Sequence, residues 1–120
     1  MGKAVVSLRT GLEDPETVTV AMLMAVGAAE SGRPTAMFLA KEAVRLALDG
    51  VAVGTAREGC PPLASLFERY AAAGGRLFVC PICFNAKQLD AAGLVKGAEL
   101  AGTVPLWEWI GDEGATTFSY

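Results

Sequence analysis

Two cysteines three residues apart, Cys80 and Cys83, are the residues of this sequence best suited to do chemistry. They follow the apolar, β-prone run 77–79 and enclose Pro81, and residues 85–89 can open a helix. This pattern predicts a strand, a tight turn and a helix, with Cys80 at the carboxyl end of the strand. Unpaired N–H groups at the start of a helix stabilise an anion, including a thiolate. Cys80 is therefore the leading candidate for a reactive thiol.

Each cysteine also has a purely structural interpretation. Free cysteine is among the most buried residue types and often serves only as a small apolar filler. The third cysteine, Cys60, lies just before a predicted helix, and nothing around it points to chemistry. Cys60 is thus an open candidate for a second reactive thiol or a substrate gate, with Cys80 and Cys83 ahead of it.

The length and composition describe one domain, residues 1–120, with an unusually apolar content. Hydrophobic residues make up 52% of the 120 residues, and the mean hydropathy is +0.40. A chain of this length buries a single core and should carry a largely polar surface. The excess of apolar residues predicts that part of the surface is covered in an interface between subunits.

Several classes of function are disfavoured by composition. The net charge is −3, and the scattered basic residues form no patch for a nucleic acid. The longest apolar run, 18–29, is too short to span a bilayer, and the amino-terminal residues do not resemble a signal peptide. We therefore expect a cytoplasmic protein with reduced thiols, bound to neither membrane nor nucleic acid.

The absence of histidine removes further possibilities. Ser-His-Asp and Cys-His catalysis and histidine-containing metal sites all need that side chain. Three cysteines alone leave a tetrahedral zinc site one ligand short unless subunits share it. No glycine-rich nucleotide motif is present either. We therefore expect no metal and no cofactor.

Short apolar runs separated by helical segments predict the fold. Strands are expected at 4–8, 34–40, 77–80, 98–101 and 115–120. Helices are expected from Asp14-Pro15 to Gly32, over 41–48, from about 62 to Gly74, up to Gly93 and over 105–110. Continuous apolar runs in this arrangement are typical of buried parallel strands. We predict an α/β protein, a three-layer α/β/α sandwich with a mostly parallel five-stranded sheet.

Two features of these elements bear on function. Apolar residues point in nearly every direction around the helix over 18–29, which predicts that it is covered on both sides. Lys41 and Glu42 follow the second strand, so they should lie at the same sheet edge as Cys80. They are either a solvated first turn of a helix or, in the case of Lys41, a cation that stabilises a nearby thiolate.

The order of these motifs resembles the DsrE/DsrF-like (YchN-type) family. The resemblance rests on Asp14-Pro15 before a long apolar helix and on Phe38-Leu39 running into Lys41-Glu42-Ala43-Val44. It also rests on Val79-Cys80-Pro81-Ile82-Cys83 and on the segment 97–102, and so covers nearly the whole chain.

The resemblance implies a three-layer sandwich assembled as a trimer, a hexamer or a related ring. For some family members it also implies a sulfur relay, in which a cysteine of this region carries persulfide sulfur between a donor and an acceptor protein. Carried over to this chain, the sulfur belongs on Cys80 or on Cys83.

Three functions remain open from the residues and the resemblance. The first is a sulfur carrier or sulfurtransferase-like protein that uses the Cys80 thiolate. The second is a thiol-disulfide redox protein in which Cys80 attacks and Cys83 resolves, because their spacing permits a disulfide. The third is an oligomeric binding or regulatory module whose cysteines are structural.

Overall fold

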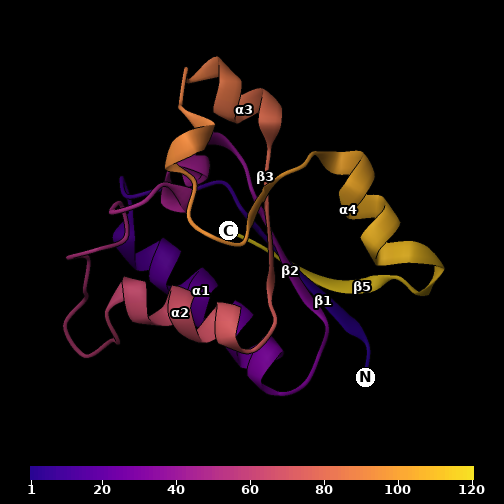
Figure 1. The fold of residues 1–120 in the computed structure, drawn as a ribbon. Helices are drawn as coiled ribbons and strands as arrows, with labels where there is room; N and C mark the ends of the chain where they lie inside the picture. Colours follow the sequence, from indigo (N-terminus) through magenta and orange to yellow (C-terminus); the bar gives the residue numbers. More distant parts are fainter.

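The sheet contains five strands that all run in the same direction. The computed structural model describes residues 1–120, and the strands lie in the order β4-β3-β2-β1-β5 (Figure 1). They are β1 (Lys3–Leu8), β2 (Thr35–Leu39), β3 (Arg76–Val79), β4 (Ala98–Leu100) and β5 (Ala115–Ser119). Each neighbouring pair is parallel. The predicted parallel sheet is confirmed, and all five strands lie at the expected places.

Helices form the two outer layers, as predicted for a three-layer sandwich. The helices are α1 (Pro15–Glu30), α2 (Leu63–Ala72), α3 (Pro81–Ala86) and α4 (Thr103–Ile110). Three short 3₁₀ helices are η1 (Lys41–Ala47), η2 (Ala91–Gly93) and η3 (Gly111–Glu113). Figure 1 shows α1 and α2 on one face of the sheet, α4 on the opposite face and α3 beyond the carboxyl end of β3.

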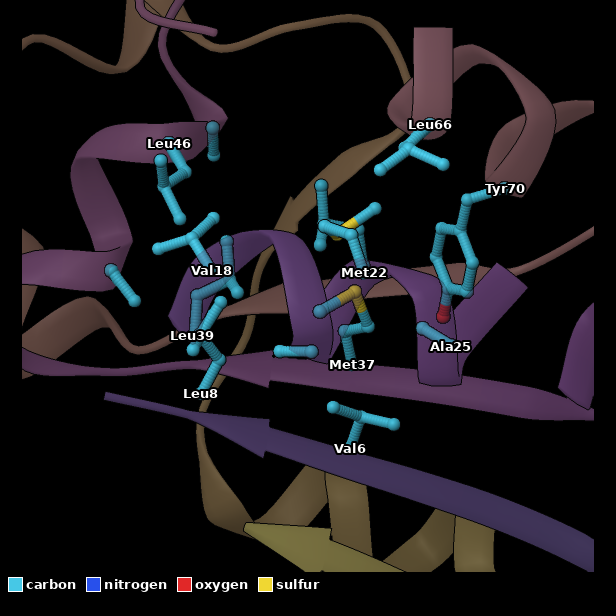
Figure 2. Packing of buried hydrophobic residues seen from close by; sticks show 14 of the residues in the cluster. Val6, Leu8, Val18, Met22, Ala25, Met37, Leu39, Leu46, Leu66 and Tyr70 are labelled. Atoms are coloured by element: carbon cyan, nitrogen blue, oxygen red, sulfur yellow. The ribbon is translucent and has the colours of Figure 1, made fainter. Parts of the chain in front are cut away.

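The main core lies between the sheet and the layer formed by α1 and α2. Val6 and Leu8 from β1 and Met37 from β2 point toward Val18 and Met22 of α1 (Figure 2). All five side chains are buried. Alternate residues of β1, β2 and β3 face the opposite side of the sheet, where α4 lies. Among them Val5, Ala36 and Phe78 are also buried. Burial on both faces explains why the strands read as continuous apolar runs rather than as alternating ones.

The start of α1 follows from its sequence. Asp14 caps the helix, because its carboxylate accepts the N–H of Thr17 at 3.2 Å and the hydroxyl of the same residue at 2.7 Å. Pro15 occupies the first turn, where no N–H is needed. Past the end of the helix, Gly32 has a φ of +92°, a conformation that favours glycine.

Within one chain α1 is covered on one side only, so a cover for its other side stays a prediction. The helix buries Val18, Met22 and Val26 against the sheet. Its outer face leaves Val20, Leu23 and Met24 exposed. The two helices of this layer lie over the middle of the sheet, so this face of the edge strand β5 also lacks a helical cover, and Phe118 is exposed there.

Two further expectations need correction. The helix after the cysteines does not follow a turn but begins at Pro81, so Cys83 lies inside α3, which ends at Ala86. The reason is that proline at the first helical position starts a helix directly. The segment that was expected to extend the helix to Gly93 instead contains Gln88 with a φ of +56° and the separate helix η2.

The other outer layer consists of α4 alone, and this helix has no fully buried residue. Its carboxyl end is held by Lys3, whose Nζ donates to the carbonyl oxygens of Trp109 at 2.5 Å and of Ile110 at 3.0 Å. The same ammonium lies 5.2 Å from the centre of the Trp109 ring. Trp107 is exposed, so it is not a core residue.

Candidate functional site

Cys80 lies directly beyond the last residue of β3, at the carboxyl edge of the sheet. Its backbone N–H donates to the carbonyl of Leu39 in β2 at 2.9 Å. On the other side, the N–H of Ala101, just past β4, donates to the carbonyl of Val79 at 3.1 Å. These bonds continue the sheet ladder by one step and fix the backbone of Cys80 between β2 and β4.

Cys80 also lies between two neighbouring strands, β3 and β4, whose following connections leave on opposite faces of the sheet. After β1, β2 and β3 the chain returns on the face of α1 and α2, where Leu94 and Val95 pack on the core before β4. After β4 it crosses to the other face and forms α4 (Figure 1). In open parallel sheets, binding sites form at the carboxyl edge at such a switch point.

The first turn of α3 surrounds the Cys80 backbone. Cys80 is the residue before the helix, and its carbonyl accepts the N–H of Phe84 at 3.0 Å. Pro81 has no N–H, and the N–H groups of Ile82 and Cys83 have no acceptor within the helix. The Cys80 side chain accepts no capping hydrogen bond. The sequence pattern predicted amides aimed at this sulfur, but the structure shows no such bond to the resting thiol.

All three cysteines are free and half-buried. Cys80 and Cys83 both pack against the edge of the main core, Cys80 as the residue that caps α3 and Cys83 inside that helix. Cys60 lies in a different segment, the loop before α2, where its N–H donates to the carbonyl of Arg57 at 2.9 Å. The structure therefore groups Cys80 with Cys83 and leaves Cys60 outside the site.

Glu42 lies at the same sheet edge as Cys80, and it joins two elements. Its carboxylate accepts a hydrogen bond from Nζ of Lys87 at 2.6 Å and another from Nε of Arg45 at 3.1 Å. The Lys87 hydrogen bond, with support from Arg45, holds the pKa of Glu42 below its usual value. Glu42 thus ties the end of α3 to η1, and Lys87 is a participant that the sequence pattern did not reveal.

Lys41 lies two residues past Leu39 and has an unusual backbone. Its φ is +53°, in the left-handed region that non-glycine residues rarely adopt. Such a conformation costs on the order of 1 kcal/mol and is found most often where a site requires it. Lys41 is exposed and has no ion-pair partner. Its ammonium is thus free to attract an anion at this edge of the sheet.

The structure also bears on metal binding and on membrane insertion. No group of three or more Cys, Asp or Glu side chains is arranged so that it could hold a metal ion. No helix combines the length and the apolar content needed to cross a bilayer.

The comparison with protein families agrees with the fold and the position of the cysteines. The model of the DsrE/DsrF-like family matches residues 3–118. The chain belongs to the DsrE/DsrF-like family. A search of curated proteins found no match to this DsrE/DsrF-like chain.

Solved structures with the same fold include three proteins that match the DsrE/DsrF-like chain over nearly its whole length. The ychN protein from E. coli has a TM-score of 0.79 at 21% identity, over 98% of this chain and 100% of its own. Protein MTH1491 from Methanobacterium thermoautotrophicum has a TM-score of 0.70 at 12% identity and covers 100% of both chains. Protein BT1422 from Bacteroides thetaiotaomicron has a TM-score of 0.68 at 17% identity, over 99% of this chain and 95% of its own. At these identities the likeness shows the fold alone.

Proposed function

We propose that this protein is a sulfur carrier that holds sulfane sulfur as a persulfide on Cys80 and passes it to the thiol of a partner protein. The observation that carries the proposal is the position of Cys80, a free, half-buried thiol at the switch point of a parallel sheet. Membership of the DsrE/DsrF-like family supports it. The chemistry needs a reduced thiol, which the cytoplasm maintains, and we place the protein there.

The transfer takes place in two displacement steps that need no oxidant. The Cys80 thiolate attacks the outer sulfur of a donor persulfide, so that a new S–S bond forms on Cys80 and the donor S–S bond breaks. The donor leaves as a thiolate. In the second step an acceptor thiolate attacks the outer sulfur on Cys80, which is released again as a thiolate. The sulfur atom is transferred twice, first to Cys80 and then to the acceptor, with no net oxidation.

The surroundings of Cys80 suit both steps. The unpaired N–H groups of Ile82 and Cys83 are available to an anion that forms beside them, such as a thiolate or a persulfide. Lys41 adds an unpaired positive charge at the same edge of the sheet. Cys83, inside α3, is the second candidate to carry the sulfur.

Mass spectrometry of the intact protein tests this function. The protein is incubated with a low-molecular-weight persulfide, and the wild type is compared with Cys80→Ser, Cys83→Ser and Cys60→Ser. We expect the wild type to gain the mass of one sulfur atom, and only Cys80→Ser to lose this gain. Cys60→Ser is the matched control, because it removes a half-buried thiol from outside the site.

Other outcomes would favour the competing functions. A loss of two hydrogen atoms under mild oxidant, without sulfur uptake and dependent on both Cys80 and Cys83, would favour a redox protein that uses the pair. This alternative is motivated by two free thiols, one at the N-cap of α3 and one inside that helix. A wild type that changes in neither experiment would favour a binding module with structural cysteines.

We also infer that the protein self-associates through the outer face of α1 and the adjoining side of β5. We call this region the α1–β5 surface: Val20, Leu23, Met24 and Phe118 are its exposed apolar side chains. They line a shallow hollow of about 600 Å³. A second copy of the chain is the occupant we propose, because the all-round apolar helix and the high apolar content both require a cover. A trimer, or a hexamer built from trimers, is the assembly that the family resemblance suggests.

A further inference from the structure

The most exposed large apolar side chain of the protein lies next to Cys80. Ile82, in the first turn of α3, is 82% exposed. In α4, Trp107 and Val104 are 69% and 65% exposed. We call Ile82, Val104 and Trp107 the apolar rim. Only two other large apolar side chains are exposed to this degree, Met1 at the chain end and Val53 in a loop.

The start of α4 lies beside the start of α3, so both helices that carry the rim begin next to Cys80. A Cβ atom built on Gly102, the residue before α4, would lie 3.6 Å from Cδ of Pro81. The ladder bond from Ala101 to Val79 holds the same two segments side by side. Figure 1 shows α4 beginning next to the carboxyl end of β3, below α3. Ile82 therefore follows the contact between Pro81 and Gly102 on the α3 side, and Val104 follows it on the α4 side.

The orientation of α4 determines which of its side chains face outward. Leu106, Trp109 and Ile110 are half-buried and belong to the side that faces the sheet. Val104 and Trp107 are three residues apart, so they lie on the same face of the helix, and both are exposed. The bonds from Lys3 to the last carbonyls of α4 hold this arrangement at its far end.

Large apolar side chains exposed on two segments that lie side by side are unusual on a small domain unless another molecule covers them. Tryptophan in particular is enriched among the residues that contribute most to binding between proteins. A molecule that covers Ile82 lies beside Cys80 as well, because only Pro81 separates the two residues. The occupant is thus identified by the chemistry of that thiol.

We propose that the apolar rim docks the segment of a partner protein that brings a cysteine to Cys80, and that apolar side chains flank this partner cysteine. The proposal rests on the proposed sulfur transfer and specifies its acceptor. Apolar flanking residues would pack on Ile82, Val104 and Trp107 while the partner thiolate approaches the outer sulfur on Cys80. A small thiol without flanking residues would react without this contribution.

The test uses two short synthetic peptides, each with a single cysteine, one with leucines on both sides of it and one with serines. The protein is first loaded with sulfur by a small persulfide, and transfer to each peptide and to a small thiol is then timed by mass spectrometry. We expect the leucine peptide to react faster than the serine peptide by about tenfold, which corresponds to roughly 1.4 kcal/mol of added binding.

Variants connect this difference to the rim. Val104→Ser and Trp107→Ser should each reduce the advantage of the leucine peptide by most of that factor while loading and transfer to the small thiol stay unchanged. Val53→Ser is the matched control, because Val53 is as exposed as Trp107 but lies between η1 and α2. The Trp107 emission of Trp109→Phe protein gives a second readout, a shift when the leucine peptide binds even without sulfur on Cys80.

The outcomes separate this proposal from the one on which it rests. Failure of the wild type to load sulfur would contradict the carrier function. Normal loading with equal transfer rates to the two peptides would contradict the docking proposal alone. So would rim variants that keep the full rate difference between the leucine and the serine peptide. A change in sedimentation of Trp107→Ser, with no effect on peptide transfer, would show that the rim is covered by a second copy and would also overturn it.

Discussion

Nζ of Lys87 donates a hydrogen bond of 2.6 Å to the carboxylate of Glu42, and this ion pair joins the end of α3 to η1. The short helix α3, which follows Cys80 and contains Cys83, therefore has a polar anchor as well as its contact with the core. The pair acts on the position of α3 rather than directly on either sulfur.

Removal of this anchor should loosen α3. We expect Glu42→Gln to raise the rate at which iodoacetamide alkylates Cys83, because the half-buried thiol is protected by the docking of α3. The matched control is Glu30→Gln, which breaks a comparably short ion pair with Arg69 away from the site. Equal alkylation of Cys83 in wild type and Glu42→Gln would show that the core contact alone fixes the helix.

The same pair predicts how the site responds to acid. The pKa of Glu42 is lowered by Lys87 in the folded protein, so the folded state binds its proton less tightly than the unfolded state does. The stabilisation is thus present above the usual glutamate value of 4.5 and is lost as the pH falls through the lower folded value. Denaturant unfolding between neutral and acidic pH should show a smaller acid loss in Glu42→Gln than in wild type. Identical curves would contradict the assignment.

Gly75 and Tyr70 predict a strong effect on stability. A Cβ atom on Gly75 would overlap the buried Tyr70 ring. The hydroxyl of Tyr70 is also fixed, because it donates to the carbonyl of Arg76 at 2.5 Å. We expect Gly75→Ala to lower the free energy of unfolding by about 1–3 kcal/mol or more. Gly27→Ala is the contrasting control, since nothing lies within 4 Å of a Cβ there, and it should stabilise α1 by about 0.5–1 kcal/mol.

The relative reactivity of the thiols tests the central assignment. At neutral pH we expect alkylation of Cys80 to be faster than that of Cys83, because Cys80 precedes α3 and the helix start favours a thiolate there. The rate at Cys60 should depend only on the exposure of its loop. Peptide mapping after short exposure to iodoacetamide measures all three rates. An inert Cys80 beside a fast Cys83 or Cys60 would make the assignment wrong.

Self-association can be tested at the α1–β5 surface. Leu23→Glu places a charge in the middle of this surface, where burial of an unpaired carboxylate is strongly unfavourable. We expect sedimentation to shift from an assembly to a monomer at micromolar concentration. Glu16→Gln, an exposed change in the first turn of the same helix, should leave the assembly intact. A wild type that sediments as a monomer would rule out the proposed interface.

Local sequence signals predicted most of the fold. Short β-branched runs identified the strands, and Asp14 with Pro15 identified the start of α1, because these signals act between neighbouring residues. The same logic placed Cys80 at the carboxyl edge of β3. It failed at Pro81, which was assigned to a turn although proline is favoured at the first position of a helix.

The remaining features of the site depend on tertiary contacts. Nothing in the sequence links Lys87 with Glu42, since only the docking of α3 on η1 brings them together. The left-handed backbone of Lys41 has no signal either, because glycine and asparagine are the usual residues there. The exposure of Ile82 follows from its outward position in the first turn of α3, and an apolar residue type alone suggests the opposite.

The pairing of the last strand with the first affects how the protein is made. Lys3 of β1 pairs with Ala115 of β5, so the first strand of the sheet to be synthesised has to wait for the last of the five strands. Until then a nascent chain exposes the free hydrogen-bonding edge of β1 together with the apolar residues of α1, a combination prone to aggregation. During synthesis, chaperones or neighbouring subunits therefore have to protect this strand edge and helix until β5 has formed.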